Sequence, residues 1–161
     1  MARQDHETRV TPSLLDRLLD YEPRLSQEPP KSRSTSLHDL KQSIRRDLEW
    51  LLNTRCHIET IDDLLEEAPY SVAFYGLPDF TGVSVKNPNE QRRMTAAIEA
   101  SIKTFEPRLL DLKVVLEPFN NIDRQLRFRI EASIDTEPAP EPIVFDSVLQ
   151  AGTGGFTIQE K

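Results

Sequence analysis

The chain has 161 residues, about the length of one domain, and a chain of this size buries about 68–70% of the surface that its unfolded form exposes. Its formal net charge of −7 argues against binding to nucleic-acid phosphates or to anionic lipid, so neither is expected as a partner. The glycines form no phosphate-binding loop, and the single cysteine excludes an internal disulfide. The sequence shows no apolar leader and no membrane-spanning run, which predicts a cytoplasmic protein that is not embedded in a membrane.

A short amphipathic helix is the first element that the sequence predicts. Pro12 suits its first position, and its apolar face consists of leucines at helical spacing, Leu14, Leu15, Leu18 and Leu19. Residues 22–35 contain three prolines and few apolar side chains, which indicates an extended linker. We therefore expect the first helix to dock separately from the rest of the chain.

A longer amphipathic helix is predicted from Ser36 to about Thr54. Ser36 and Asp39 have the spacing of a capping box at its start. The apolar residues that follow lie at helical spacing and are Leu37, Leu40, Ile44, Leu48, Leu51 and Leu52. One face of this helix is therefore expected in the core.

The middle of the chain combines helical and turn-forming patterns. Acidic residues flank a pair of leucines at 64–65, which predicts a short helix that Pro69 closes. The next segment contains a turn at Gly76. Its apolar residues 71–75 are compatible with a strand or with one helical turn.

Residues 87–90 have the sequence of a helix start. Asn87 suits the N-cap, Pro88 the first position and Glu90 the third. The buried stripe of this helix is expected to be Met94, Ala97, Ile98, Ile102 and Phe105. Pro107 is expected to end the helix, because the residue before a proline is disfavoured in the α conformation.

Alternating apolar and polar residues in 110–117 and 125–134 predict two strands. The intervening residues 118–123 fit a hairpin loop, so the strands are expected to be antiparallel neighbours, and the first is expected to bury Leu110, Leu112, Val114 and Leu116. Residues 143–149 are a candidate third strand, and 155–158 a candidate fourth. Helices first and strands last predict an α+β fold, in which a small, largely antiparallel sheet of three to four strands in the C-terminal half is covered by helices from the N-terminal half.

No residue pattern identifies a catalytic or metal site. Cys56 and His57 are adjacent, and neighbouring ligands alone do not close a metal site. Glu49 lies beside the only tryptophan, Trp50, but adjacent helical residues point in different directions, so a solvated face is expected. We therefore predict no catalytic residue, no metal ligand and no cofactor.

Glu106, Pro107 and Arg108 form the candidate partner-binding site. The proline fixes the backbone where a helix is predicted to pass into a strand, so the flanking carboxylate and guanidinium are held in set directions. Such a guanidinium suits bidentate pairing with a carboxylate of another chain. The alternative is that Arg108 binds carbonyls at its own helix end while Glu106 pairs locally.

Several motifs, in order, resemble the TssE family of small baseplate wedge subunits in bacterial type VI secretion systems, which is related to a baseplate protein of contractile-tailed phages. They are SLLDRLLD at 13–20, SIRRDLEWLLNTR at 43–55, SVAFYGLPDFTG at 71–82, AAIEASIKTFEPRLLDLKVVL at 96–116 and LRFRIEASI at 126–134. The Glu-Pro-Arg motif of the family falls on Glu106, Pro107 and Arg108.

The resemblance implies a structural role and a fold similar to the docking domain of the sheath. It implies assembly with TssF and TssG into the wedge around the hub, and a platform on which the TssB–TssC sheath starts to polymerise. It also suggests contacts with hub, spike and inner tube proteins, at a baseplate docked on the inner face of the cytoplasmic membrane complex. A lysozyme-like label in this family leaves a peptidoglycan hydrolase as the alternative, although no carboxylate pair here identifies a hydrolase site.

The patterns divide the chain into an N-terminal segment with a tail, helix and linker (1–35), a wedge domain (36–150) and a glycine-rich tail (151–161). An exposed edge of the C-terminal sheet is expected to accept a strand from the first sheath ring, because main-chain pairing gives affinity without catalytic groups. The hypothesis places this edge in residues 143–149.

Overall fold

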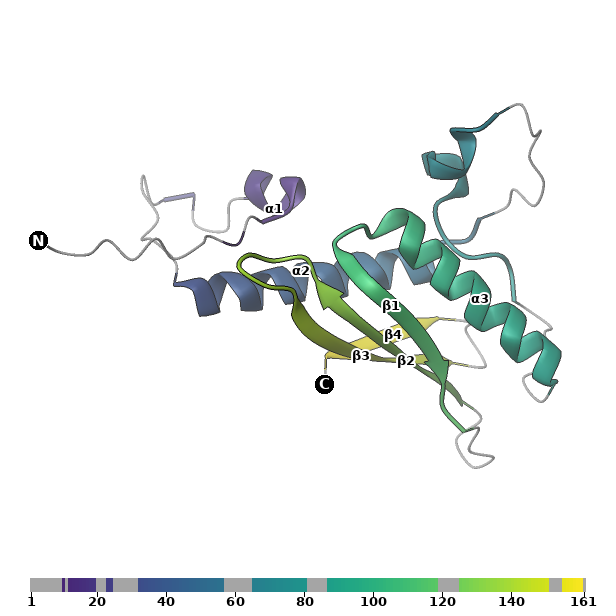
Figure 1. Cartoon of the computed structure of the whole chain (residues 1–161). Coiled ribbons are helices and arrows are strands. Elements are labelled where there is room, and N and C mark those ends of the chain that lie inside the picture. The colour runs from purple at the N-terminus through teal and green to yellow at the C-terminus, as the bar shows by residue number, and fades with distance from the viewer. Residues whose placement is uncertain are drawn as a thin grey trace, which may run out of the picture.

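The computed structural model describes residues 10, 12–19, 23–24, 32–56, 65–80, 87–118, 125–150 and 155–160. The elements in chain order are α1 (Leu14–Leu18), α2 (Arg33–Asn53), the 3₁₀ turns η1 (Ala68–Tyr70) and η2 (Val72–Phe74), α3 (Pro88–Phe105), β1 (Leu109–Leu116), β2 (Gln125–Ile134), β3 (Glu141–Gln150) and β4 (Phe156–Glu160). Helices come first and strands last, which confirms the predicted α+β class (Figure 1).

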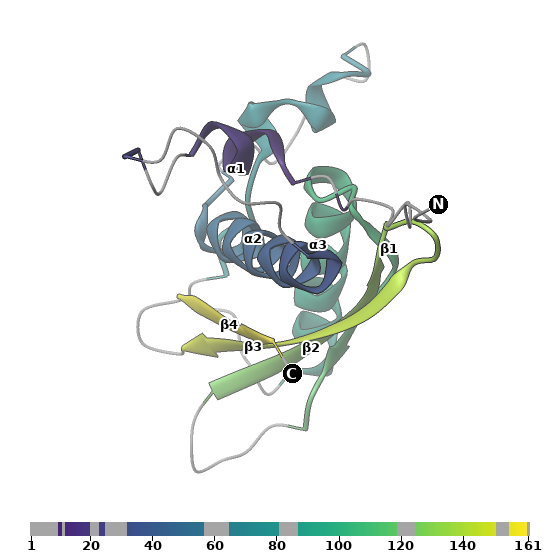
Figure 2. The ribbon, with the colours of Figure 1, turned by 90° about the vertical axis from the view of Figure 1, so that its left-hand side faces the viewer.

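The strands form one antiparallel sheet in the order β1-β2-β3-β4. Within it, Ile130 of β2 lies opposite Val114 of β1 and Phe145 of β3. α2 and α3 lie on the same face of the sheet, α2 against β4 and α3 against β1 (Figure 2). No described helix covers the other face, and the strands therefore alternate between buried and more exposed residues.

The core lies between the two long helices and the covered face of the sheet. Its most buried side chains include Ile44, Leu48, Leu52, Met94, Ile98, Ile102, Phe128, Ile130, Ile134 and Phe145. Full burial of one such side chain contributes about 1.5–3 kcal/mol. Among the described residues, no helix is long and apolar enough to cross a membrane.

α2 begins earlier than the sequence predicts. Its first residue is Arg33, and the N-cap is Ser32, whose side chain accepts a 3.2 Å hydrogen bond from the third backbone N–H of the helix. The prediction of a start at Ser36 is wrong, because Ser32 and Ser36 lie one turn apart and the turn between them contains no apolar residue that periodicity could detect. The predicted end near Thr54 is confirmed.

α1 is short and begins after the predicted position. Ser13 is its N-cap, so Pro12 lies before the helix and does not occupy its first position. The helix contains no buried residue. Most of the linker predicted after it lies outside the described residues.

β1 departs from simple alternation at its start. Leu109 is buried, whereas Leu110 is 36% exposed. Asp111 has a φ of 51°, and the pairing with β2 shifts in register between Leu110 and Lys113. This bulge turns Leu110 away from the core, so its predicted burial is wrong, while the rest of the strand keeps its alternation.

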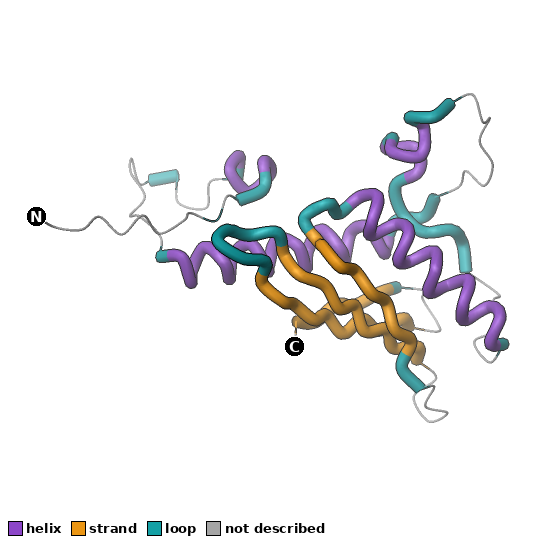
Figure 3. Tube along the Cα trace, in the orientation of Figure 1, coloured by secondary structure: helices purple, strands orange, loops and turns teal. Residues whose placement is uncertain are grey.

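Residues 65–80 extend to one side of the helices (Figure 3). The helix predicted around 64–65 falls mostly outside the described residues. Pro69 does not close a helix but lies inside η1. Of the two possibilities for 71–75, one helical turn is confirmed, because η2 is a single 3₁₀ turn.

Gly76 joins this segment to the helices. Its φ is 115°, and a Cβ at this position would lie 2.5 Å from the carbonyl oxygen of Thr54. Leu77 N–H donates to the same Thr54 oxygen at 2.9 Å, and Cys56 N–H donates to the Leu77 carbonyl at 2.8 Å. The Ser101 hydroxyl of α3 donates to the Gly76 carbonyl at 2.9 Å. The backbone is therefore held by both long helices.

α3 follows the sequence closely. Asn87 caps it, Pro88 is its first residue, and the helix ends before Pro107. Of the predicted stripe, Met94, Ile98 and Ile102 are buried, and the other two side chains are partly buried.

Candidate functional site

The chain passes from α3 into β1 at Glu106, Pro107 and Arg108. Glu106 has φ −126° and ψ 71°, outside the helical region, as expected before a proline. Its carbonyl accepts a 3.2 Å hydrogen bond from Leu109 N–H, where β1 begins. Glu106 is only 4% exposed, whereas Pro107 is exposed. The corner therefore presents its ring outward and its carboxylate inward.

The Arg108 guanidinium holds Glu106 and α2 together. Its Nε and Nη2 donate to the two carboxylate oxygens of Glu106 at 2.5 Å each, a bidentate pair. Nη2 also donates to Asp47 Oδ2 at 2.6 Å, and Nη1 donates to the Ser43 hydroxyl at 3.4 Å. Both acceptors lie on α2. The Glu106 carboxylate thus pairs within its own chain, and contact of these residues with another chain stays a prediction.

Arg46 extends these contacts from α2 to α1. It donates to Asp47 at 2.9 Å and to Asp16 of α1 at 2.8 Å. The Ser43 hydroxyl donates to Asp16 at 2.5 Å, and the Arg46 guanidinium lies 5.1 Å from the centre of the Trp50 ring. We call the connected charged side chains the ionic network; its members are Asp16, Arg46, Asp47, Glu106 and Arg108.

Both arginines of the ionic network are firmly charged. Burial alone lowers the pKa of Arg108, but hydrogen bonds and the charges of Glu106 and Asp47 outweigh it, so that the pKa lies above the usual arginine value. The pKa of Arg46 is raised in the same way, against the effect of burial, by Asp16 and Asp47. The two groups are therefore positively charged at neutral pH.

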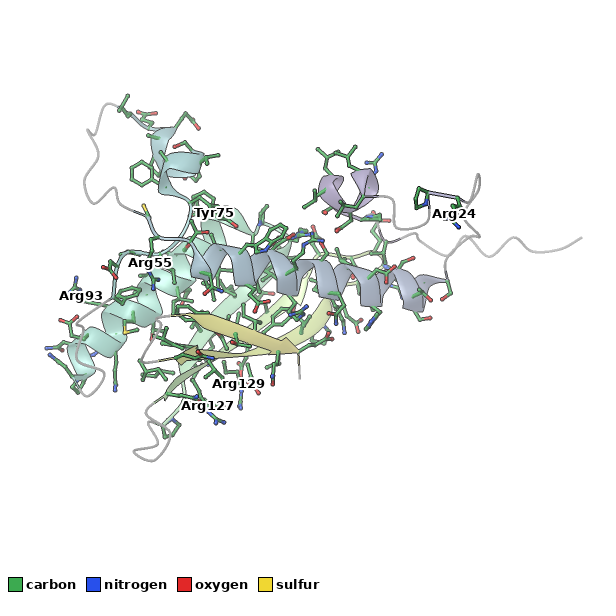
Figure 4. All side chains as sticks on the ribbon, turned by 180° about the vertical axis from the view of Figure 1, so that it is seen from behind. Arg24, Arg55, Tyr75, Arg93, Arg127 and Arg129 are labelled. Atoms are coloured by element: carbon green, nitrogen blue, oxygen red, sulfur yellow. The ribbon has the colours of Figure 1, made fainter. Side chains whose placement is uncertain are left out.

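The pKa values of Asp16 and Tyr75 are also shifted by burial and by neighbouring groups. Burial raises the pKa of Asp16, but hydrogen bonds from Ser13, Ser43 and Arg46 more than reverse this, and the net pKa is lowered. Burial raises the pKa of Tyr75, and nearby carboxylates add to the effect, so its hydroxyl stays protonated at neutral pH. Tyr75 lies near the C-terminal end of α2 (Figure 4).

β4 is the edge strand on the α2 side of the sheet. Gln150 N–H donates to the Gly155 carbonyl at 3.0 Å, so the backbone groups of Gly155 point toward β3. In an antiparallel pair the backbone groups of successive residues point alternately toward and away from the neighbouring strand. The backbone N–H and C=O groups of Phe156 and Ile158 therefore point outward, away from β3. The Asn53 side chain covers the first outward position, because its amide donates to the Phe156 carbonyl at 2.9 Å and accepts from Phe156 N–H at 2.8 Å. Ile158 is the next outward position.

β3 is not an edge. Ile143 lies opposite Ala132 of β2, and Val148 lies opposite Thr157 of β4. The hypothesis of a free edge in residues 143–149 is therefore wrong, because the weakly patterned segment after the glycines adds a further strand beside it.

An open groove runs between α2 and the outward side of β4. Its volume is about 670 Å³, and it is lined by His38, Gln42, Arg45, Ile158, Gln159 and Glu160. Glu160 is held across it by Lys41 at 3.6 Å and by Gln42 at 3.5 Å. The groove therefore borders the part of the β4 edge that Asn53 leaves open.

The other face of the sheet carries charged side chains. Arg129 of β2 donates to Glu117 at 2.5 Å and to Asp146 of β3 at 3.3 Å. Figure 4 shows Arg127 and Arg129 on the side of the sheet away from α2. This arrangement is that of a solvated antiparallel face.

Glu49 lies on α2, and Cys56 lies just after the C-cap of that helix. Glu49 pairs with Arg45 at 3.3 Å on the surface of α2, and Trp50 is 53% exposed, so Glu49 does not lie in an apolar pocket. Cys56 is partly buried, and His57 lies outside the described residues. In the part of the chain that the structure describes, no group of three His, Cys, Asp or Glu residues could hold a metal ion.

The sequence patterns do not identify Asp47 and Ser43 as partners of Arg108, Asp16 as the partner of Arg46, or Asn53 as the partner of Phe156. A sequence signal exists for Asp47 and Ser43. They lie four residues apart on α2, beside the apolar stripe of that helix, so both polar side chains are expected to be at least partly buried and close to each other. Asn53 gives no such signal, because a helix-terminal asparagine is ordinary.

Residues 38–139 match the family described as baseplate wedge protein gp25. No curated protein matches the sequence. The family match covers more than half of the chain and includes most of α2, all of α3, the corner at 106–108, β1 and β2. The chain therefore belongs to the family of the baseplate wedge protein gp25.

Proposed function

We propose that the chain is a structural, non-enzymatic subunit of a type VI secretion baseplate. In this proposal it assembles with TssF and TssG into the wedge, on the cytoplasmic side of the membrane complex, and starts polymerisation of the TssB–TssC sheath. Membership of the gp25 family supports the structural role, and the motifs shared with TssE support the type VI system. Hub, spike and inner tube proteins are further partners in the proposal.

The corner at 106–108 is the observation that carries the proposal. A nearly buried carboxylate, 4% exposed, is held by a bidentate guanidinium that is also fixed to α2. Ion pairs of this kind add little net stability, but they set one geometry, because a misplaced charge would be left unpaired. We propose that the corner presents Pro107 and the exposed part of Arg108 to a neighbouring subunit in a fixed orientation.

We also propose that β4 accepts a strand from the sheath. The outward backbone groups at Ile158 and the groove beside α2 support this, because an added strand needs unpaired main-chain groups and space for its side chains. β1, the other outer strand, is interrupted by the bulge at Asp111, a feature that discourages pairing.

The proposal is tested by removing both charges of the corner at once. Arg108→Ala alone would strand the buried Glu106 carboxylate and cost about 3 kcal/mol of folding free energy. The combination of Glu106→Met with Arg108→Met keeps the volume roughly constant and leaves neither a charge nor an unpaired polar group at the buried position 106. We expect this double variant to melt within a few degrees of the parent and to block sheath formation, observed with a fluorescent sheath subunit in cells.

The matched control is Arg93→Ala on α3, the helix that leads into the corner. Arg93 is 74% exposed and pairs with Glu90 at 3.1 Å, so its loss is expected to change neither melting nor sheath formation. Normal sheaths with the folded double variant would reject the role of the corner in assembly. Lost sheaths with Arg93→Ala would show that the assay responds to any lost arginine.

The absence of enzymatic activity is tested directly. Purified protein incubated with peptidoglycan is expected to release no muropeptides above the buffer level, with a lysozyme as the positive control. Release of fragments that increases with protein concentration would support the hydrolase alternative instead.

A further inference from the structure

The Asn53 side chain, at the end of the helix that runs beside β4 (Figure 2), pairs with both backbone groups of one β4 residue. Its amide nitrogen donates to the Phe156 carbonyl at 2.9 Å, and its amide oxygen accepts from the Phe156 N–H at 2.8 Å. In an antiparallel sheet, a hydrogen-bonded residue of a neighbouring strand exchanges the same two bonds with the residue opposite. The Asn53 amide therefore takes the place of one residue of an added strand.

The end of α2 holds this amide in place. The amide nitrogen also donates to the Glu49 carbonyl of the same helix at 2.7 Å. The neighbouring Leu51 and Leu52 are 2% and 0% exposed, so the helix end is anchored in the core. Turning the amide over would bring its oxygen against two carbonyl oxygens, neither of which can donate a hydrogen bond. The side chain is therefore fixed, although Asn53 lies at the surface.

The outward-facing backbone groups of β4 belong to Phe156, Ile158 and Glu160, because these groups alternate along an antiparallel strand. A strand that slips by two residues keeps the same faces and meets equivalent hydrogen-bonding groups. A strand that comes from another chain also lacks the hairpin turn that fixes the register of two connected strands. Main-chain pairing by itself therefore leaves the register of an added strand open.

We infer that Asn53 is a positioning residue that sets the register of the strand that β4 accepts. This inference rests on the proposed function, in which that strand comes from the sheath. The Asn53 amide occupies the pairing position at Phe156, so the added strand stops there and pairs beside Ile158, next to the groove. The partner that fits is an extended segment that offers a backbone N–H and C=O opposite Ile158.

A purely structural role for Asn53 makes a different prediction. In that case the hydrogen bonds of its side chain tie α2 to β4, and their loss lowers the melting temperature without moving the position of an added strand. If Asn53 sets the register, its loss releases Phe156 for pairing and makes a second register available, two residues away. The position of the added strand therefore separates the two roles, and a melting curve does not.

The test places a photo-crosslinking amino acid at Gln159, which lines the groove, in the full chain in cells that assemble baseplates. Mass spectrometry of the adducts then locates the partner residue that lies beside β4. With Asn53 present, we expect adducts at one residue of the sheath strand and at its direct neighbours. With Asn53→Ala, we expect a second set of adducts, shifted by two residues along the same strand.

Two control variants accompany Asn53→Ala. Ser101→Ala removes the buried hydrogen bond from α3 to the Gly76 carbonyl, so it lowers the melting temperature without changing a β4 contact. Asn89→Ala replaces an exposed asparagine of α3, the helix that packs against β1. Both controls are expected to keep the single set of adducts. Two sets with Ser101→Ala would show that the register follows general stability, which would overturn the role of Asn53.

The remaining outcomes separate this inference from the proposed function. A single, unshifted set of adducts with Asn53→Ala, or two sets already with Asn53 present, would reject the register role and leave strand acceptance by β4 standing. Loss of every adduct with Asn53→Ala would also reject the register role, because the edge would then need Asn53 for its structure. Absence of sheath adducts from Gln159 with Asn53 present would instead reject strand acceptance itself, and the inference with it.

Discussion

Gly76 shows how a single residue positions a whole segment. Its positive φ, and the 2.5 Å that would separate a Cβ from the Thr54 oxygen, exclude any side chain there. Its carbonyl is bound by Ser101 at the same time. Residues 75–77 are thereby fixed between α2 and α3, which places Tyr75 beside the ionic network.

Gly76→Ala is expected to destabilise the protein by roughly 3 kcal/mol, because the backbone strain and the clash with Thr54 act together. For a protein of this size the melting temperature should fall by about 10 °C, measured by circular dichroism. Gly155→Ala is the matched control and should change the stability by less than about 1 kcal/mol, since Gly76 is the glycine with a positive φ among the described residues. An unchanged melting temperature with Gly76→Ala would contradict the tight packing of this segment.

At the residue scale, the sequence predicts unusual backbone conformations more readily than it predicts the contacts of side chains. Gly76, Asn87 and Pro107 are identified by their backbone preferences, which are local properties. The partners of Arg108 on α2 are not, because Asp47 and Ser43 lie 61 and 65 residues away in the chain. Only the fold brings them together.

At the scale of elements, the two outer strands of the sheet are protected differently. β1 is interrupted by a bulge between Leu110 and Lys113, and β4 is covered at Phe156 by the Asn53 side chain. Beyond Phe156 the β4 edge borders a groove. The part of β4 beyond Phe156 is therefore a short edge segment suited to receive a strand.

A photo-crosslinker at Gln159, which lines this groove, is expected to react with the sheath subunit during assembly. The matched position is Lys113, an exposed residue of β1, which should give no sheath adduct. The adducts can be identified by mass spectrometry of assembled baseplates. Sheath adducts from Lys113 alone would place the acceptor edge on β1 and contradict the assignment to β4.

Element boundaries are predictable where a local signal is unique. α3 has one N-cap and one terminating proline, and its predicted limits are confirmed. α2 has two serines that could cap it, so its predicted start lies one turn too late. The bulge at Asp111 is not predictable, because alternation of apolar residues continues through Leu110 in the sequence even though the backbone does not follow it.

At the scale of the whole molecule, the sequence predicts the α+β class because helical and alternating patterns occupy separate halves. It also predicts the antiparallel order of neighbouring strands, since their connections are short. It does not predict which strand is the edge, because β4 is a short segment with little patterning. The division of the chain at residues 35 and 150 stays a prediction, although α2 begins at Arg33 and β4 joins the sheet.

The ionic network also defines a path for mechanical force. Its charged groups connect α1 to α2, and α2 to the start of β1, with Asp47 between the two arginines. Tension applied to the leucines of α1 would reach the corner at 106–108 through these side chains, without first stretching the backbone between them. Such a path would link two surfaces of the chain that are distant in sequence.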